Sequence, residues 1–599
     1  MTGYATHPTA ITRVALLRRA AAETPEHVVF ESVDGPSLTY ADWDARSAAL
    51  ARYLAERGAR PGGRIVLVFP QEEWVLFACW HAAALRAGVT VLPVSARFTP
   101  AEVAQLTAAV RPSHVVSAEP PAGLPAGVVR LDPHTVPAPG GPAPADAPTP
   151  GISELVCTSG TTGQSKIIAC SEANLLAPLA VDADSGLVVP ATPERSLHST
   201  VIGTAGGQRI LNGAYTGGGS TYISLADAGP RRLLDAIERH RPDRVGLVPA
   251  SASALLESDT AERDLGSVRV VTVSTAAATP ALLTAVQRLF PRAEVVRMYG
   301  ATEILPAGAA MVFDPEQPDA VGAPVGRTLI SVRDENFTEL PPGSPGRVWL
   351  RYAGAPPRRL WVSPDDVRDL DREGWLWAGD LGSADGAGLL HIDGRADDVL
   401  NVGGMRVSPG EIEAVLAEHP AVAETAVHGE PDGAAGDRVT ALVVTRRTMA
   451  AAELRRFAAA RLARHKVPSV VRFVPELPRG VTGKVARHLL HQPHPDPSEP
   501  TPTPTPGQAD RTDPAAFVRA QWAQHTTDVL NPGATFFDLG GTSLDAMTLM
   551  TRVEEEFGVE LPADALYTHP TLTEFLRLMA ELTTGSATPL PSPRGEMRS

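Results

Sequence analysis

Hydrophobic and polar positions in the first 115 residues alternate between two patterns. Residues 64–69 form a continuous apolar run that ends at a proline, which predicts a buried strand, and residues 89–94 predict a second one. Residues 38–57 lead into a helix rich in Ala and Leu, and residues 71–87 predict a further helix. Thr-Pro-Ala-Glu at 99–102 has the form of a capping box with proline at the first helical position. Strands that alternate with helices indicate a parallel sheet covered by helices.

The same alternation returns between about 152 and 330. Residues 244–249, 268–273 and 295–299 predict buried strands. The last of them runs into Tyr-Gly-Ala-Thr-Glu at 299–303, a turn that brings a ring, a hydroxyl and a carboxylate to the carboxyl end of a strand. Open α/β sheets bind ligands at this edge. A surface turn with incidental polarity is the alternative.

Past residue 490 the pattern changes twice. Residues 491–513 are Pro-rich and predict a semi-rigid linker that, fully extended as polyproline II, spans roughly 70 Å at about 3.1 Å per residue. Residues 514–583 contain Ser543, followed by apolar positions at spacings of three and four, which predict a helix with one buried stripe. The free N–H groups at a helix N-terminus favour a phosphodiester on Ser543, and a simple N-cap is the alternative. Residues 584–599 predict a disordered tail.

Composition excludes several classes of protein. The net charge of −15, without a basic stripe, argues against nucleic-acid binding. No run approaches the roughly 18 apolar residues of a membrane span, and the first eight residues are polar, so we expect a cytoplasmic protein. Three scattered cysteines predict neither a disulfide framework nor a zinc site.

Lysine usage singles out two glycine-bearing turns. The chain has 53 Lys and Arg together, of which only Lys166, Lys466 and Lys484 are lysine. Lys166 ends Cys-Thr-Ser-Gly-Thr-Thr-Gly-Gln-Ser-Lys at 157–166, whose N–H groups, hydroxyls and ammonium suit phosphate oxygens. It is not a Walker A loop, which requires Gly-Lys-Ser/Thr, and an ordinary polar turn is the alternative. Lys484 ends a second glycine-bearing turn, and Arg cannot replace an ammonium that must act as a point charge. Lys466 has no evident chemistry, which indicates a structural or surface role.

These motifs together resemble the adenylate-forming superfamily, which includes acyl- and aryl-CoA synthetases, luciferases and peptide-synthetase adenylation domains. The run at 158–166 resembles its phosphate loop, although Ser165 stands where the family usually has proline. The turn at 299–303 resembles the second core motif, Ala-Gly-Asp-Leu-Gly at 378–382 the third, and Gly-Arg-Ala-Asp-Asp at 394–398 the hinge of the C-terminal subdomain. The resemblance implies an α/β adenylation core at 1–393 and a small α+β lid at 394–490.

The resemblance also implies a role for each matching residue. Lys484 would contact the carboxylate of the acid substrate and the bridging oxygen, and Glu303 would hold Mg²⁺, a hard cation that prefers oxygen ligands. Asp380 would bind both ribose hydroxyls, assisted by Arg395. The remaining implied ATP-binding residues are Thr158, Ser159, Gly160, Thr161, Thr162, Gly163 and Lys166 around the β- and γ-phosphates, Tyr299 on the adenine, and Gly300 and Thr302 in the same turn as Glu303.

Two further parts of the chain fit this resemblance. Asp397 is implied as the residue about which the lid rotates after adenylation, and the pair Gly403-Gly404 could let a thiol arm pass close to the backbone. Ser-Pro-Gly-Glu at 408–411 predicts a capping box at the start of a lid helix. Asp-Leu-Gly-Gly-Thr-Ser-Leu at 538–544 resembles the attachment motif of all-α four-helix carrier domains, in which the serine, here Ser543, bears 4′-phosphopantetheine.

The substrate pocket is the least determined part. Amino-acid-activating relatives usually have an aspartate early in the substrate stretch, but residues 196–207 contain no carboxylate. An unpaired ammonium in a pocket is costly, so we expect an acid without an α-amino group, such as an aryl acid. The implied pocket residues are His198, Ser199, Gly203, Thr275 and Ala276.

The resulting hypothesis is an adenylation–thiolation didomain of nonribosomal peptide or related natural-product biosynthesis, which activates a small carboxylic acid with ATP. We expect a phosphopantetheinyl transferase to modify the carrier. No condensation or thioesterase pattern follows, so we expect a separate acyl-accepting enzyme downstream. The alternatives are a didomain that activates α-amino acids, an acyl-CoA ligase with a vestigial carrier, and an inactive scaffold that presents the carrier.

Overall fold

The structure is a computed structural model whose chain divides into two compact units, Met1–Glu499 and Pro500–Ser599. It describes residues 11–121, 124–125, 127–137, 147, 150–158, 166–178, 193–226, 229–431, 436–480, 483–492, 514–525, 535–536, 549–550, 552–553, 557, 559, 561 and 565–584. Within these residues the predicted α/β core and the small α+β lid are confirmed. No helix in the described ranges has the length and hydropathy needed to cross a bilayer.

Thirteen of the described strands form the first sheet of the core. They are β1 (Val28–Ser32), β2 (Ser37–Thr39), β9 (Arg195–His198), β10 (Thr221–Ser224), β11 (Arg244–Leu247), β12 (Val270–Val273), β13 (Glu294–Tyr299), β14 (Ala309–Val312), β15 (Ala320–Pro324), β16 (Thr328–Arg333), β17 (Gly346–Tyr352), β20 (Leu376–Ala384) and β21 (Leu390–Arg395). Their spatial order is β16-β17-β20-β21-β15-β14-β13-β12-β11-β9-β10-β1-β2. The run from β1 through β10, β9, β11 and β12 to β13 is parallel, as its alternation with helices predicts.

Eight of the described strands form the second sheet, in the order β19-β18-β8-β7-β4-β3-β5-β6. Their bounds are β3 (Arg64–Phe69), β4 (Thr90–Ser95), β5 (His114–Val116), β6 (Val129–Leu131), β7 (Glu154–Thr158), β8 (Lys166–Cys170), β18 (Arg359–Ser363) and β19 (Asp366–Asp369). The strands β3 and β4 are the two buried strands predicted from apolar runs in the first 115 residues.

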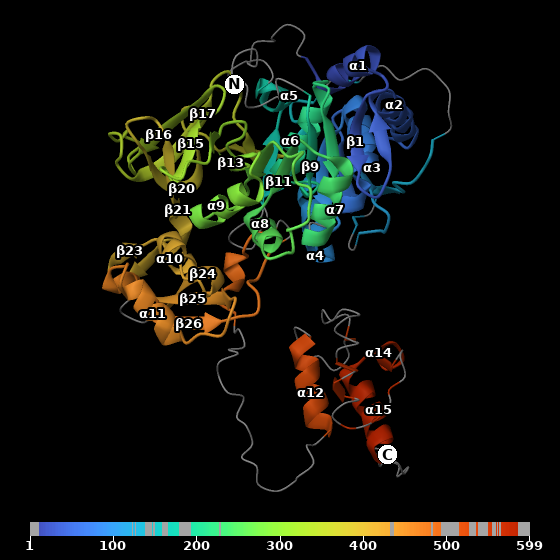
Figure 1. Cartoon of the computed structure of the whole chain (residues 1–599). Helices are drawn as coiled ribbons and strands as arrows, with labels where there is room; N and C mark the ends of the chain where they lie inside the picture. The colour runs from blue at the N-terminus through green and yellow to red at the C-terminus, as the bar shows by residue number, and fades with distance from the viewer. Residues whose placement is uncertain are drawn as a thin grey trace, which may run out of the picture. The chain divides into compact units, whose positions relative to one another are not determined.

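The helices of the core pack on these two sheets (Figure 1). They are α1 (Arg13–Glu23), α2 (Tyr40–Glu56), α3 (Trp74–Arg86), α4 (Pro100–Val110), α5 (Glu172–Leu175), α6 (Ala205–Tyr215), α7 (Pro230–His240), α8 (Pro249–Leu256) and α9 (Pro280–Leu289). The capping box predicted at α4 is confirmed, because the Glu102 N–H donates to Thr99 Oγ1 and the Thr99 N–H donates to the Glu102 carboxylate.

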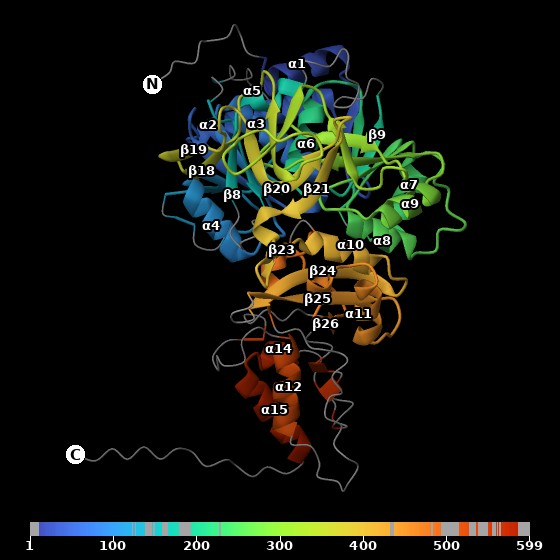
Figure 2. The ribbon, with the colours of Figure 1, turned by 90° about the vertical axis from the view of Figure 1, so that its left-hand side faces the viewer.

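The lid has a three-stranded sheet, β24 (Val422–Pro431), β25 (Asp437–Thr445) and β26 (Val470–Phe473), and a hairpin, β22 (Leu400–Val402) with β23 (Met405–Val407). Two helices, α10 (Pro409–Ala417) and α11 (Ala451–Ala459), pack on that sheet (Figure 2). The capping box predicted at 408–411 is wrong. The Ser408 hydroxyl donates instead to the Asp393 carbonyl at 2.7 Å, and Glu411 accepts from Lys466 Nζ at 2.6 Å. Lys466 therefore has the structural role expected of it.

The second unit contains α12 (Pro514–His525), α14 (Ala565–Thr568) and α15 (Leu572–Thr584) among its described residues. Its core buries Trp522, Phe536 and Phe575 completely. Met550, Val553 and Phe557 belong to the predicted apolar stripe that follows Ser543; Val553 is fully buried, and Met550 and Phe557 pack against the same core. The predicted all-α character is confirmed for this described part, whereas Ser543 lies outside it.

Candidate active site

The parallel strands β9, β11, β12 and β13 end together at one edge of the first sheet. His198 pairs with Gly246, Gly246 with Thr272, and Thr272 with Val296, so these four positions lie at one level. The segments that follow carry Ser199, Thr275 and the turn after Tyr299. The structure therefore brings the predicted substrate residues and the predicted ATP turn to the same carboxyl edge.

A hydrogen-bonded group of three side chains lies beside this edge. The Tyr299 hydroxyl donates to Asp380 Oδ2 at 2.6 Å, and Arg395 Nη1 donates to Asp380 Oδ1 at 3.3 Å. Burial, and then the negative charge of Asp380, raise the pKa of Tyr299, so this phenol stays protonated. A carboxylate has about four acceptor sites, and the two bonds leave capacity for a diol. The geometry is compatible with the predicted ribose site.

The backbone around Asp380 is adapted to this arrangement. Asp380 on β20 pairs directly with Arg395 on β21, and the Trp377 indole N–H donates to the Asp380 carbonyl at 3.0 Å. Gly379 has φ +93°, and a Cβ there would lie 2.8 Å from Arg395 Nη2. A side chain at 379 would therefore displace the guanidinium from the carboxylate. This requirement explains the glycine of the motif at 378–382.

Lys484 of the lid belongs to the same electrostatic group. Its side chain is accessible to solvent, yet it lies close enough to protein atoms for desolvation to lower its pKa. The negative charges of Glu303 and Asp380 raise the pKa of Lys484, and the positive charge of Arg395 lowers it further. Glu303 and Lys484 lie 181 positions apart in the chain (484 − 303), so the fold brings together four residues that sequence analysis selected: Glu303, Asp380, Arg395 and Lys484.

The lowered pKa of Lys484 predicts a pH dependence. A lysine with a lowered pKa loses its ammonium as the pH rises through that lowered value. We therefore expect kcat/KM for Mg-ATP, which reports the free enzyme, to fall on the alkaline side before the ordinary lysine pKa of 10.5. Pyrophosphate exchange measured across the pH range checks this. A rate that stays level up to that pH contradicts it, and Lys466→Ala should leave the alkaline limb unchanged.

The described ends of the predicted phosphate loop are anchored in the second sheet. Thr158 closes β7, Lys166 opens β8, and the two residues pair across these antiparallel strands. The loop is therefore the connection of a hairpin. Ser159, Gly160, Thr161, Thr162 and Gly163 lie outside the described residues, and Lys166 is exposed at the loop's far end.

The described residues contain no cluster of three His, Cys, Asp or Glu side chains that could enclose a metal ion. Glu303 offers one carboxylate in the electrostatic environment of Lys484, and Asp380 offers a second that is already bonded to Tyr299 and Arg395. Mg²⁺ is commonly held by one or two carboxylates together with substrate phosphates and water. The carboxylate of Glu303 therefore fits an ion that arrives with ATP.

His198, the first residue of the implied pocket, is buried and neutral. Burial lowers its pKa to about 3, and its ring meets the Trp74 ring edge-on with centroids 5.2 Å apart. Its Nδ1 accepts from the Thr200 N–H at 3.4 Å, and its buried Nε2 has no hydrogen-bond partner among the residues that the structure describes. His198 consequently adds no charge to the pocket and offers one free polar atom.

Two backbone positions define the walls of the implied pocket. Gly203 has φ +82°, and a Cβ there would lie 2.6 Å from the Pro93 carbonyl oxygen, so only glycine fits. Thr275 has φ +85°, which is unusual for a β-branched residue. Thr275 and Ala276 are both exposed at the edge of the sheet.

The predicted hinge lies where the core meets the lid. Asp397 is exposed within the short 3₁₀ turn Ala396–Asp398. The neighbouring Asp398 pairs with Arg487 at 3.1 Å, and Arg487 also holds Glu413 of α10 at 2.9 and 3.0 Å. The segment that carries Lys484 is thus tied to the hinge and to the first helix of the lid.

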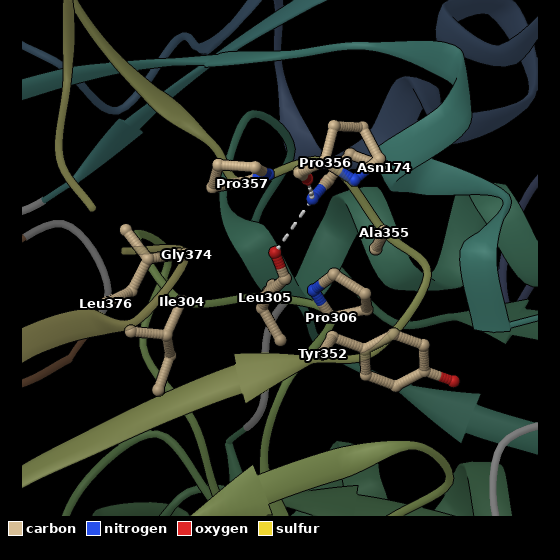
Figure 3. A pocket seen from close by; sticks show the side chains of 10 residues that line it. All are labelled: Asn174, Ile304, Leu305, Pro306, Tyr352, Ala355, Pro356, Pro357, Gly374 and Leu376. Atoms are coloured by element: carbon tan, nitrogen blue, oxygen red, sulfur yellow. Dashed lines mark hydrogen bonds between the residues drawn. The ribbon is translucent and has the colours of Figure 1, made fainter. Parts of the chain in front are cut away.

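Sequence analysis missed two residues next to the predicted ATP turn, Asn174 and Arg358. Both contact carbonyls of residues 302–305, and a cavity of about 10 Å³, near the minimum for one water, lies beside Asn174 (Figure 3). Their partners lie between 56 and 184 positions away in the chain. Periodicity and local motifs carry no signal at such separations.

Comparison with known proteins identifies the family. The model described as AMP-binding enzyme matches residues 17–355, that of its C-terminal domain matches 411–484, and that of the phosphopantetheine attachment site matches 518–579. Because the first match spans more than half of the 599 residues, the chain belongs to the AMP-binding enzymes. The same chain carries a phosphopantetheine attachment domain. The predicted superfamily, ATP as nucleotide and phosphopantetheine as prosthetic group are confirmed at this level.

Several known proteins are similar to this chain. A probable non-canonical nonribosomal peptide synthetase, CymA of Salinispora arenicola, is 28% identical over 97% of this chain, which spans 8% of that protein's length. A CoA ligase for a methyl-dioxo-octahydroindenyl propanoate from Mycobacterium tuberculosis is 30% identical, with 80% of this chain and 98% of that protein covered. The structure of ATP-bound MatB from Rhodopseudomonas palustris superimposes with a TM-score of 0.70 at 26% identity over 80% of this chain and 98% of that chain.

Proposed function

We propose that this chain activates a small carboxylic acid with Mg-ATP and transfers the acyl group to a phosphopantetheine thiol on Ser543. The observation that carries the proposal is the position of Lys484. This lid lysine lies in the electrostatic environment of Glu303, Asp380 and Arg395 of the core. A carrier attachment domain in the same chain supplies the acceptor.

The first step is adenylation. A carboxylate oxygen of the acid attacks the α-phosphorus of ATP, the bond from that phosphorus to the bridging oxygen breaks, and pyrophosphate leaves. Both reactants are anions, and two unit charges 4 Å apart repel by about 4 kcal/mol at an effective dielectric of 20. The Lys484 ammonium offsets this repulsion and stabilises the developing charge. Glu303 would hold Mg²⁺, which would supply positive charge at the phosphate oxygens, and Asp380 would hold the ribose.

The second step is thioester formation. The phosphopantetheine thiol gives up its proton and attacks the acyl carbonyl carbon, and the carbon–oxygen bond to AMP breaks. The products are the thioester, AMP and a proton. Rotation of the lid about Asp397 would withdraw Lys484 and admit the thiol arm. The pair Gly403-Gly404, with φ +58° and +83° and open space at both Cβ positions, offers a backbone that the arm can approach.

The pocket favours an acid without an α-amino group. The described stretch 196–207 has no carboxylate, and His198 is neutral with a pKa of about 3. A substrate ammonium would therefore enter the pocket without a counter-ion from this stretch, which is costly. An aryl or other acid for natural-product assembly fits better than an α-amino acid.

A second candidate is an acyl-CoA ligase with a vestigial carrier. It is favoured by the similarity to the M. tuberculosis CoA ligase, which aligns over nearly the whole of that protein. The two candidates share the adenylation step and differ in the thiol that accepts the acyl group.

A panel of carboxylic acids tests the proposal. We expect one class to support ATP–pyrophosphate exchange, and we expect the loaded acyl group to appear on the holo-carrier in preference to free CoA. Exchange with α-amino acids alone would overturn the substrate class. Faster transfer to CoA would favour the second candidate. No exchange with any acid would leave an inactive scaffold as the better reading.

A further inference from the structure

The turn that carries Glu303 is held by two side chains from outside its own strand. Arg358 Nη1 donates to the Thr302 carbonyl at 3.0 Å, and Asn174 Nδ2 donates to the Leu305 carbonyl at 3.2 Å. Figure 3 shows the Asn174 amide pointing at Leu305. Glu303 and the residue after it lie between these two anchored carbonyls.

The two anchoring side chains are also bonded to each other. Arg358 Nε donates to Asn174 Oδ1 at 3.0 Å, and Asn174 Nδ2 makes a second bond, to the Pro356 carbonyl, at 2.9 Å. Asn174 is 1% exposed and Arg358 is 3% exposed. We call this pair the turn bracket. Its rotamers are fixed by these bonds and by burial, so the anchored carbonyls have little freedom to move.

In the turn bracket, the buried guanidinium of Arg358 donates hydrogen bonds to neutral acceptors. The three acceptors of Arg358 are the oxygens of Asn174, Thr302 and Gln208, the last at 2.7 Å. Burying a charge is expensive unless hydrogen bonds compensate it. The planar fork of arginine reaches three acceptors in fixed directions, which lysine cannot do. Bonds to three neutral acceptors therefore fix the direction of the guanidinium, whereas a carboxylate partner would mainly add electrostatic attraction.

The bracket connects the two sheets of the core. Asn174 lies on α5, four residues beyond the end of β8, the strand that Lys166 opens. Gln208, which Arg358 contacts, donates to Glu154 at 3.0 Å, and Glu154 begins β7. The turn with Glu303 follows β13 of the other sheet. The bracket thus joins both strands that flank the phosphate loop to the turn with the metal-binding carboxylate.

We propose that Asn174 and Arg358 are positioning residues that set the distance between Glu303 and the paired strand ends at Thr158 and Lys166, so that one Mg-ATP can be held between them. This inference rests on the proposed adenylation function. Misplacement of a catalytic group by about 1 Å can cost about 10²-fold in rate. Weakening the bracket should therefore lower kcat/KM for Mg-ATP and leave the KM for the acid largely unchanged.

Arg358→Lys in the full chain is the main test. It keeps the charge and removes the fork. Its matched control is Arg64→Lys, because Arg64 also donates to backbone carbonyls, those of Val110 and Arg111, but lies at the first residue of β3. We expect about 10- to 100-fold lower kcat/KM for Mg-ATP in Arg358→Lys, a raised Mg²⁺ requirement and an unchanged KM for the acid. The control should keep the wild-type kinetic ratios.

A second variant and an equilibrium binding measurement test the same role of the bracket independently of Arg358→Lys. Asn174→Asp retains the acceptor for Arg358 and loses the donor to Leu305, so it should show the same pattern, and the double variant should be less than additive. Equilibrium binding of Mg-ATP and of metal-free ATP needs no acid. We expect weaker binding of Mg-ATP and unchanged binding of metal-free ATP.

The outcomes separate this inference from the proposed function. The bracket would be only structural if Arg358→Lys and Arg64→Lys both lost thermal stability while Arg358→Lys kept the wild-type ratio of affinities for Mg-ATP and metal-free ATP. If the wild type exchanges pyrophosphate with no acid, the proposed function fails, and the Mg-ATP binding comparison still decides the role of the bracket.

Discussion

Replacing Lys484 by alanine is expected to reduce ATP–pyrophosphate exchange by about 10²- to 10³-fold, the usual cost of removing one preorganised group that stabilises developing charge. The reason is the repulsion between the carboxylate and the triphosphate, which the ammonium offsets. Arg395 is a positive group nearby, but it is bonded to Asp380 and to the Ala378 carbonyl. It is therefore not free to replace the lysine.

Lys466→Ala is the matched control for this prediction, because it removes a lysine of the same lid whose ammonium is bonded to Glu411. We expect exchange within about twofold of wild type, as is usual when a partly exposed ion pair is lost. A second assay separates the two steps. When preformed acyl-adenylate is supplied, Lys484→Ala should still transfer the acyl group. Equal loss of exchange in both variants would contradict a catalytic role for Lys484.

The ends of the buried strands were predictable because the physics behind them is local. The apolar runs that became β3 and β12 end where predicted, at Phe69 before a proline and at Val273 before a polar turn, whereas β11 ends at Leu247, two residues before the predicted end, because Pro249 begins α8. The turn after β13 could therefore be placed at the ligand edge from sequence. The pairing of Tyr299 with Asp380 could not, because it joins residues 81 positions apart through the order of strands in the sheet.

Local rules also failed where a tertiary contact was stronger. The Ser-Pro-Gly-Glu segment at 408–411 satisfies the spacing of a capping box, yet Ser408 bonds across to Asp393 and Glu411 bonds to Lys466. An ammonium–carboxylate bond is stronger than the neutral N–H contact it replaces. Thr275 is a similar case, because no propensity scale predicts a left-handed backbone conformation, here φ +85°, for a β-branched residue. Such exceptions concentrate near functional sites.

Replacing Ser543 by alanine is expected to abolish attachment of phosphopantetheine, because the phosphodiester has no other oxygen at that position. Intact-mass measurement after incubation with a phosphopantetheinyl transferase and CoA checks this. The wild type should gain one phosphopantetheine, and Ser543→Ala should gain none. Thr542→Ala is the matched control, since it removes the neighbouring hydroxyl, and it should be modified as fully as the wild type.

The same variant separates the two halves of the proposed reaction. The attachment domain at 518–579 lies in a different compact unit from the adenylation site, so Ser543→Ala should keep full pyrophosphate exchange. Acyl loading of the protein should fall below detection, because the only proposed thiol is missing. If the variant still retains acyl label after denaturation, the acceptor is a different group in the chain. If the wild type gains no arm and acylates free CoA instead, the carrier is vestigial and the enzyme works as a CoA ligase.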